Sequence, residues 1–314
     1  MIERDYAYFM TIVAERGLGR AATRLEVSQP ALSRAIQRLE ARHGQRLLER
    51  TPRGVEPTEA GRVLTAALSA IERQASDADA RLTDLAFGQR GAVRIGVAYT
   101  LAAPVHAALF PRFLEDRPGA TLRLDTGLNY DLVPALEDGR HDFVVAAVPE
   151  WHGALLEVHP LRRDELVPVA REGHPIFRVP EPTPEDVLRH PLAGSDAGTT
   201  FWRHLRDRLR AADLDVPGLS VTSNSFDAIL RIVGSTDCIA FAPRGHVDGP
   251  AAVPGLRAIP VPALTHPRTI GLLTRRGAAL SSVAMRAATL VCTAFGADPL
   301  APPQTPQTLQ NLQT

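Results

Sequence analysis

Apolar residues near the start of the chain recur every three or four positions, which is the spacing of a helix. The first such stripe, residues 6–13, ends at the glycines of residues 17–19. A second stretch predicts a short helix over residues 20–26, and a third predicts a helix over residues 28–43. Three short helices in succession predict a small all-α domain at the N-terminus.

The third predicted helix has two chemically different faces. Leu32, Ile36 and Leu39 are spaced four and three apart, which predicts one buried face. The opposite face carries Gln29, Ser33, Arg34 and Gln37. Two short helices joined by a tight turn, the second with a polar and basic face, are typical of a helix-turn-helix. Such a helix fits the major groove of DNA, where Gln can pair with adenine and Arg with guanine.

Residues 47–56 predict a small wing after this helix. Two short strands flank a turn at residues 51–54, with Arg50 and Arg53 placed for a phosphate or the minor groove. The formal net charge of the whole chain is zero, but nine arginines and only three glutamates lie between Arg16 and Val55. This basic segment favours nucleic acid as a partner. The alternative is that any three-helix domain carries a solvated polar face.

A long helix is predicted over residues 58–90, with Thr58 as its cap. Its apolar positions follow one another in steps of four and three: Leu64, Leu68, Ile71, Ala75, Ala78, Leu82 and Leu85. This heptad seam predicts that two copies of the helix pair, through Leu64, Leu68, Ile71 and Leu82. The alternative is a long helix lying on the core of its own domain.

Strand and helix patterns alternate over residues 91–295, which predicts an α/β domain with parallel strands. The predicted strands are residues 92–98, 122–126, 142–146, 166–170, 192–193, 221–222, 239–242 and 269–274. The predicted helices are residues 102–117, 130–137, 201–212, 226–233 and 281–295. Residues 296–314 are rich in Pro, Gln and Thr, so a disordered tail is expected there.

The N-terminal residues resemble the DNA-binding domain of LysR-type transcriptional regulators. The resemblance is carried by Phe9, Ala21, Ala22, Leu25, the run of residues 27–33, Ile36, Leu39, Glu40, Leu47, Leu48, Arg50, Thr58 and Gly61. It implies a winged helix-turn-helix over residues 1–57, a dimerising linker helix over residues 58–90, and a ligand-responsive regulator. One departure is that Gly17 and Gly19 stand where the family usually has Ser or Thr before the second helix. A slightly less stable start of the second helix is expected, because Gly is a weaker N-cap than Ser or Thr.

The same resemblance implies a two-lobed, periplasmic-binding-protein-like effector domain over residues 91–295. Family-like motifs are Leu136, Gly139 and Asp142, then residues 172–175, and then Val233 and Gly234 followed by residues 239–243. Lobe I is expected to span about residues 91–162 and 267–295, and lobe II about residues 163–266. Crossing segments are expected near residues 161–167 and 262–269.

Ligands of such folds lie between the lobes, at strand ends and helix starts. The expected effector-binding residues are Tyr99, Thr100, Leu101, Asn129, Tyr130, Ser195, Thr199, Thr200, Phe201, Asn224, Ser225 and Phe226. Hydroxyl groups at helix N-termini favour an anion, because free N–H groups and the helix dipole attract negative charge. The alternative for each Ser, Thr and Asn is a simple helix cap.

The sequence shows no pattern typical of catalysis, metal binding or cofactor binding. Cys238 and Cys292 are read as inert packing, the ten histidines lack metal-ligand spacing, and no catalytic, phosphate-loop or dinucleotide motif is found. We therefore expect that the protein is not an enzyme and that it binds neither a metal ion nor a cofactor. The first residues are charged, unlike a signal peptide, and no apolar run approaches the ~20 residues of a membrane span. A cytoplasmic, bacterial protein without membrane contacts is expected.

The sequence thus predicts a sequence-specific, DNA-binding transcription regulator modulated by a small, anionic effector. The residues expected to bind DNA are Leu18, Arg20, Ser28, Gln29, Pro30, Ser33, Arg34, Gln37, Arg38, Arg50 and Arg53, with the helix-turn-helix at about residues 18–37. The expected partners are a double-stranded operator, the effector, further copies of the chain in a homodimer or tetramer, and RNA polymerase. One alternative is a solute-binding transport protein, which leaves the helix-turn-helix unexplained. The other is an enzyme with an accessory DNA-binding domain, for which no catalytic constellation is found.

Overall fold

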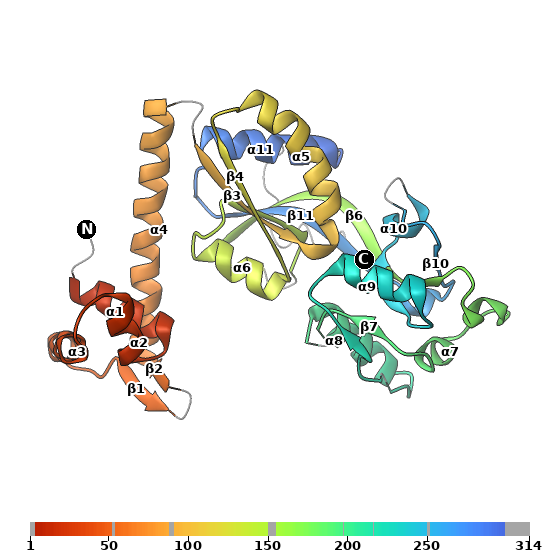
Figure 1. Ribbon diagram of the computed structural model, residues 1–314, viewed down its shortest axis with the longest axis horizontal. Helices are drawn as coiled ribbons and strands as arrows, with labels where there is room; N and C mark the ends of the chain where they lie inside the picture. Colours follow the sequence, from red (N-terminus) through yellow and green to blue (C-terminus); the bar gives the residue numbers. More distant parts are fainter. Residues whose placement is uncertain are drawn as a thin grey trace. The chain divides into compact units, whose positions relative to one another are not determined.

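The computed structural model describes residues 4–51, 54–87, 91–149, 155–196, 198–215, 217–249 and 252–298. The chain divides into two compact units, Met1–Arg81 and Leu82–Thr314 (Figure 1). Helix α4 (Glu59–Phe87) begins in the first unit and ends in the second. The predicted wing residue Arg53 and all but the start of the tail predicted at residues 296–314 lie outside the described residues.

The first unit is a helix-turn-helix followed by a wing, as predicted. Its elements are α1 (Arg4–Glu15), α2 (Leu18–Arg24), α3 (Gln29–His43), β1 (Leu48–Thr51) and β2 (Gly54–Pro57), which precede α4. Phe9, Ile12 and Leu32 are fully buried in one core that all three helices share. The prediction for the second helix was wrong by two residues at each end. That helix cannot extend to Glu26, because this residue adopts a left-handed backbone with φ of 54°.

Two glycines allow close approaches that hold the wing against the helices. A Cβ on Gly61, in the first turn of α4, would lie 2.0 Å from the Leu47 carbonyl oxygen. A Cβ on Gly54 would lie 2.4 Å from the Arg16 carbonyl oxygen, and its φ of 119° lies in the region that favours glycine. The Arg16 carbonyl also accepts a hydrogen bond from the Val55 N–H (3.1 Å). The hairpin is therefore fixed to the turn between α1 and α2.

Helix α4 is capped by Thr58, whose Oγ1 accepts a hydrogen bond from the Gly61 N–H (3.1 Å). The predicted seam along this helix divides into two parts. Leu64 is half-buried and Leu68 is only 4% exposed, and both pack on the core of the first unit. Ile71 and Leu82 are instead 50% and 62% exposed. The first part therefore follows the alternative interpretation, a helix lying on its own domain, and only the second part is available to another chain.

Lobe I of the second unit is built on a sheet whose first strand lies between the second and third. Its strands lie in the order β4 (Thr121–Gly127), β3 (Ala92–Ala98), β5 (Phe143–Ala147), β11 (His266–Arg275) and β6 (Leu156–Arg171). β3 is parallel to both β4 and β5, as predicted. Helices α5 (Ala102–Asp116) and α11 (Ser282–Ala294) cover one face and α6 (Asn129–Glu137) covers the other (Figure 1).

Lobe II repeats this order with shorter strands. Its strands are β8 (Val221–Thr222), β7 (Ala193–Gly194), β9 (Ala240–Pro243), the second half of β6, and β10 (Leu256–Ala258). A parallel bridge between Leu192 and Ile239 joins β7 to β9. The helices of this lobe are α7 (Pro184–Leu188), α8 (Thr200–Arg210), α9 (Phe226–Ser235) and α10 (Gly245–Asp248). The α/β fold class is therefore confirmed in both lobes.

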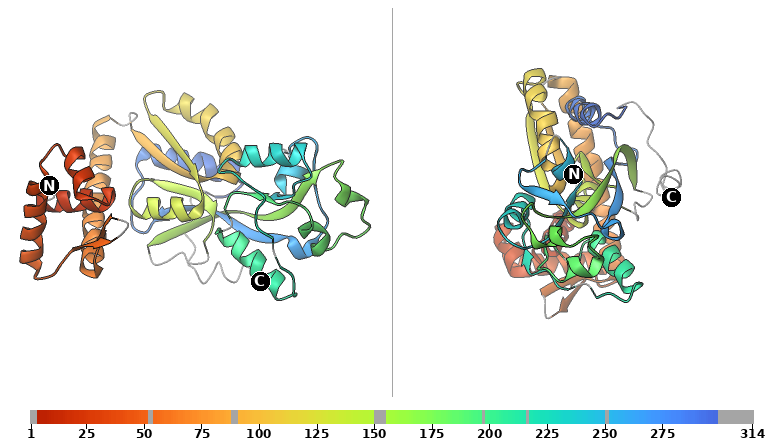
Figure 2. Two further views of the ribbon diagram at one scale, coloured as in Figure 1. Left: turned by 60° about the horizontal axis from the view of Figure 1, so that its bottom comes forward. Right: turned by 90° about the vertical axis from the view of Figure 1, so that its right-hand side faces the viewer.

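Strands β6 and β11 are antiparallel partners and run from one lobe into the other (Figure 1 and the left view of Figure 2). Their register shifts between Ile270 and Gly271. The predicted crossing segment at residues 161–167 falls on β6, whereas that at residues 262–269 overlaps β11 only from His266 onward. The sequence missed the first half of β6, because Glu157, His159 and Arg162 interrupt the apolar pattern there.

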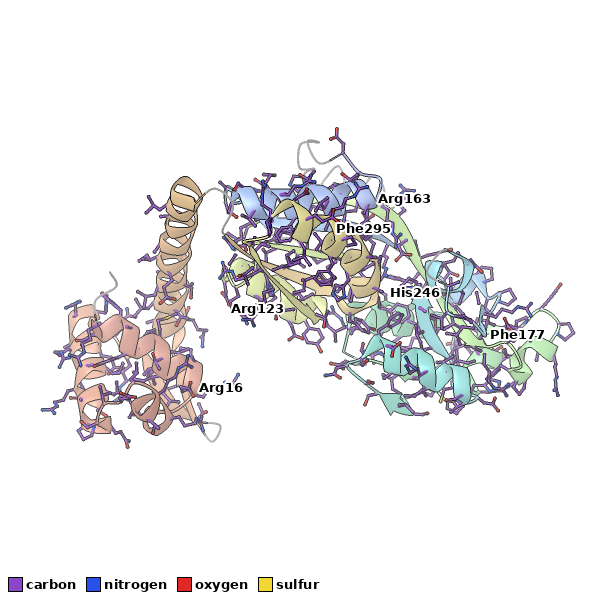
Figure 3. All side chains as sticks on the ribbon, turned by 45° about the horizontal axis from the view of Figure 1, so that its top comes forward. Arg16, Arg123, Arg163, Phe177, His246 and Phe295 are labelled. Carbon is purple, nitrogen blue, oxygen red and sulfur yellow. The ribbon has the colours of Figure 1, made fainter. Side chains whose placement is uncertain are left out.

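Each lobe has apolar clusters of its own. Val97, Phe113 and Phe143 belong to the cluster of lobe I, while Trp202 and Phe226 belong to two clusters of lobe II. Figure 3 shows side chains filling both lobes, with Phe295 in lobe I and with His246 and Phe177 in lobe II. Two cores joined by two strands are an arrangement in which the lobes can move about the crossing strands.

Candidate functional site

The start of α3 presents an exposed polar surface. Ser28 precedes the helix with an extended backbone, but its side chain makes no capping hydrogen bond. Pro30 lies in the first turn, where its missing N–H costs little. The predicted DNA-binding residues Ser28, Gln29, Pro30, Arg34 and Gln37 are all exposed, and Ser33 is half-buried. The arrangement therefore offers short polar and basic side chains at the N-terminal end of a helix.

Two of the predicted DNA-binding arginines make contacts within the domain. Arg38 forms a two-pronged ion pair with Asp5 of α1, with N–O distances of 2.7 and 2.8 Å. Its hydrogen bond holds the pKa of the Asp5 carboxyl below its usual value. Arg20 donates hydrogen bonds to the carbonyls of Glu15 (2.7 Å) and Arg16 (3.1 Å), at the end of α1. These two arginines fasten α3 and α2 to α1.

Leu18 and the wing complete the predicted set. Leu18 is half-buried and packs against the core of the first unit. Arg50 ends up in β1, but its side chain and all of Arg53 lie outside the described part of the chain. The exposed residues at the start of α3 are therefore the described part of the candidate DNA surface.

A cavity of about 830 Å³ lies between the two lobes. It opens at the carboxyl ends of strands, since Ala98 of β3, Gly127 of β4, Ala147 of β5 and Gly194 of β7 all line it. Nine of the predicted effector residues line it as well: Tyr99, Thr100, Asn129, Tyr130, Ser195, Thr199, Thr200, Phe201 and Phe226. Three others do not: Leu101, Asn224 and Ser225. Leu101 is 1% exposed within the core of lobe I.

Two tyrosines link the lobes across this cavity. The hydroxyl of Tyr99 in lobe I donates to Ser195 Oγ in lobe II (3.2 Å). The hydroxyl of Tyr130 in lobe I donates to Asp196 Oδ2 (3.0 Å). Burial raises the pKa of Tyr99, while hydrogen bonds from the Gly198 N–H and from Tyr130 lower the pKa of Asp196. At neutral pH, both tyrosines are therefore protonated donors and Asp196 is an ionised acceptor.

Several of the hydroxyl and amide side chains have structural partners. Thr199 Oγ1 accepts from the Trp202 N–H (3.4 Å) and caps α8. Ser225 Oγ accepts from the Ala228 N–H (3.3 Å) and caps α9. Asn129 Nδ2 donates to the Ala147 carbonyl (2.7 Å), which ties α6 to β5. The simple cap, kept open as an alternative, describes Thr199 and Ser225.

The cavity is also lined by charged side chains that were not among the effector-binding residues predicted from the sequence. They are Arg163, Arg203, Arg208, Arg268, Asp164 and Asp207, together with His204 and His266. Among the described residues that line the cavity, four arginines outnumber two aspartates, which gives this set a positive net charge when the histidines are neutral. Arg268 pairs with Asp164 (2.7 Å), with side chains only 13% and 7% exposed, and joins β11 to β6. A usable signal was the polar spacing of residues 203, 204, 207 and 208 along one face of the predicted helix.

Comparisons with known proteins agree on one family. Residues 4–62 match the bacterial regulatory helix-turn-helix proteins of the lysR family, and residues 87–294 match the LysR substrate binding domain. The SDS degradation transcriptional activation protein of Pseudomonas sp. (strain ATCC 19151) is 30% identical over 90% of this chain and 92% of its own length. The HTH-type transcriptional regulator GbpR of Rhizobium radiobacter is 26% identical over 74% of this chain and 78% of its own length.

Solved structures share the fold across both units. CbnR, a LysR family transcriptional regulator, superposes with a TM-score of 0.59 at 20% identity, covering 94% of this chain and 99% of that one. A full-length variant of OxyR from Pseudomonas aeruginosa gives a TM-score of 0.58 at 23% identity, covering 96% of this chain and 97% of that one. A winged helix-turn-helix joined to a two-lobed effector-binding domain defines a ligand-responsive transcription regulator. The chain belongs to the LysR family of transcriptional regulators, as predicted.

The remaining functional predictions concern absences. The relatives are named as regulators of transcription, which agrees with the prediction that the chain is not an enzyme. Cys238 and Cys292 are both buried thiols. Among the residues that the structure describes, no cluster of His, Cys, Asp and Glu could hold a metal ion. Within the same residues, no helix is both long and apolar enough to cross a membrane.

Proposed function

We propose that this regulator reads operator DNA with the exposed start of α3. Gln29 and Arg34 have the side chains that pair with adenine and guanine edges in the major groove. Both are exposed, and the Arg34 Nε makes a long contact of 3.4 Å with the Pro30 carbonyl. Arg20 and Arg38 hold the helices in place behind this surface, and the wing arginines Arg50 and Arg53 contact the DNA backbone.

We further propose that a small anion in the cavity between the lobes controls this DNA binding. The observation that carries the proposal is the positive wall of the cavity, with four arginines and two aspartates. Thr100, which follows β3 of lobe I, and Ser195, which follows β7 of lobe II, supply hydroxyl groups to the same space. Effector binding then shifts the equilibrium between two arrangements of the lobes. The size of the shift is limited by the difference in the ligand's affinity for the two arrangements.

Pairing of copies completes the proposal. The exposed part of α4, with Ile71 and Leu82, joins two chains so that two recognition helices face a two-fold operator. The bound oligomer then acts on RNA polymerase at the neighbouring promoter.

The test uses the full chain and a fluorescent operator obtained by selection from random duplexes. Anisotropy is measured with carboxylates, phosphates, sugar acids and short alkyl sulfates, the last because one relative is named for SDS degradation. An anion should change the operator affinity, and Thr100→Val and Ser195→Ala should each weaken that response. A response that both variants keep in full would place the effector elsewhere. A response to neutral apolar compounds alone would refute the anionic effector.

A further inference from the structure

One wall of the cavity gathers positive charge from α8 and β11. His204 and Arg208 lie one turn apart on α8, and His266 and Arg268 lie two residues apart on β11. The rings of His204 and His266 are 5.7 Å apart between centroids. We call these four residues the cationic wall.

The two arginines of the cationic wall differ in their partners. Arg268 is neutralised by Asp164, at 2.7 Å. Arg208 donates one hydrogen bond to the Thr265 carbonyl (2.9 Å) and pairs with no carboxylate among the described residues. Desolvation also lowers the pKa of Arg208, although a guanidinium stays charged. Arg208 is therefore a partly desolvated cation whose charge is not neutralised by a carboxylate in the part of the chain that the structure describes.

His266 is held neutral inside this positive surrounding. Burial is the main cause that lowers its pKa to about 4, and Arg208, His204 and Arg268 lower it further. The acidic groups that line the same cavity, among the residues with a described position, are Asp207 on α8 and Asp164 on β6, and Asp164 is already paired with Arg268. The ring nitrogens of His266 make no hydrogen bond within the described residues. An added anion would therefore favour protonation of this ring.

An aromatic surface continues from the cationic wall. The ring centroid of Phe201 lies 5.5 Å from that of His266, 4.9 Å from that of Phe241 and 5.3 Å from that of Trp202. All of these rings line the cavity. A flat apolar group packs well against such a surface, at ring distances typical of aromatic pairs.

We infer that the cationic wall and Phe201 select an aromatic carboxylate, with the carboxylate at Arg208 and the ring against Phe201, and that His266 takes up a proton from solvent on binding. The inference rests on the proposed function, which places the effector in this cavity. Beyond the proposed function, the inference specifies the chemical class of the ligand and the residues that determine specificity for it. Arg208 and His266 are thus specificity residues, distinct from the hydroxyl groups of Thr100 and Ser195.

Binding to the full chain can be followed by the fluorescence of Trp202, which lines the cavity. The probes are benzoate and phenylacetate, with benzamide and phenylacetamide as uncharged counterparts. We expect each acid to bind at least about tenfold more tightly than its amide. Arg208→Ala should remove this preference, whereas Arg210→Ala, on the same helix but outside the cavity wall, should keep it.

Proton uptake is measured by calorimetry at about pH 5.5, in two buffers of different ionisation enthalpy, because His266 is neutral there without ligand. Wild type should take up protons with the acids, while His266→Asn should bind them without uptake. His159→Asn, outside the cavity wall, should behave as wild type. Equal binding of acid and amide, no binding of either acid, or equal effects of Arg208→Ala and Arg210→Ala would each overturn the inference. An acid whose binding depends on Thr100 but not on Arg208 would overturn it and leave the proposed function standing.

Discussion

The Tyr99 hydroxyl of lobe I donates a hydrogen bond to Ser195 Oγ of lobe II, 3.2 Å away. Tyr99 also packs edge-on against Phe226 of lobe II, with ring centroids 5.4 Å apart. One side chain at the end of β3 therefore contributes both a polar and an apolar contact to the closed arrangement of the lobes. Any ligand that enters between them must keep these contacts or replace them.

Tyr99→Phe should make the lobes separate more often. The ring contact stays, but one hydrogen bond worth about 0.5–1.5 kcal/mol is lost, so the open population rises by up to about tenfold. Hydrogen exchange of the backbone amides in residues 192–203 should become faster. Tyr6→Phe, in the first unit, should leave this exchange unchanged. Unaltered exchange in Tyr99→Phe would show that the bond does not hold the lobes together.

Two alanine substitutions should change the stability of the first unit in opposite directions. Gly61→Ala should destabilise it by about 1–3 kcal/mol, because the new Cβ would clash with the Leu47 carbonyl. Gly19→Ala, where nothing lies within 4 Å, should stabilise it by about 0.5–1 kcal/mol, since alanine favours a helix. Calorimetry of the full chain measures both. A Gly61→Ala protein as stable as wild type would contradict the close approach of α4 to the Leu47 carbonyl.

His266 should make the stability of the second unit depend on pH. Its pKa is about 4 in the folded chain and about 6.5 when unfolded, so the unfolded chain binds more protons between these values. Its contribution is complete above about pH 6.5 and is lost as the pH falls towards about 4, by at most about 3 kcal/mol. Both tryptophans belong to this unit, so their fluorescence reports its unfolding.

The comparison is between wild type and His266→Asn, with His159→Asn as the control. The difference is informative because burial also lowers the pKa of His141, His190 and His246, which act in the same direction. The wild-type curve should be steeper than that of His266→Asn over this pH range. Parallel curves would show that His266 titrates normally in the folded chain.

Substitutions at the apolar positions of α4 should distinguish residues that mediate self-association from residues that stabilise the fold. Ile71→Glu and Leu82→Glu change exposed side chains, so each should weaken self-association while leaving the fold intact. Leu68→Glu should instead unfold the first unit, because Leu68 is 4% exposed within its core. Sedimentation velocity and circular dichroism distinguish the two effects, with Glu72→Gln as the control. Unchanged sedimentation in both exposed-site variants would contradict the pairing surface.

The fold could be predicted from the sequence wherever apolar spacing was regular. The faces of α3 and the short strands β5 and β9 follow directly from it. The first half of β6 could not be predicted, because its pairing with β11 tolerates polar residues such as Glu157 and His159. The start of α2 was misplaced because Gly17 caps it without any side-chain signal.

The candidate site was predictable only in part, and for a similar reason. Tyr99, Thr100 and Ser195 follow predicted strands, so a local rule found them. Arg268 and Asp164 lie 104 positions apart and meet only because β6 and β11 pair across the lobes. Leu64 and Leu68 fit a heptad seam, yet their own domain buries them, which no local pattern could decide. Two features therefore could not be predicted from the sequence: which distant strands pair, and whether an apolar helix face packs on its own domain or on another chain.

The central claim is that the exposed start of α3 reads operator DNA. Its most direct test is selection of random DNA duplexes by the full chain, followed by anisotropy on the enriched sequence. Wild type should enrich one motif with two-fold symmetry. Arg34→Ala and Gln29→Ala should each lose about 1–3 kcal/mol of binding free energy and accept other bases at one position of each half-site. Enrichment of the same motif with unchanged affinity in both variants would contradict the claim.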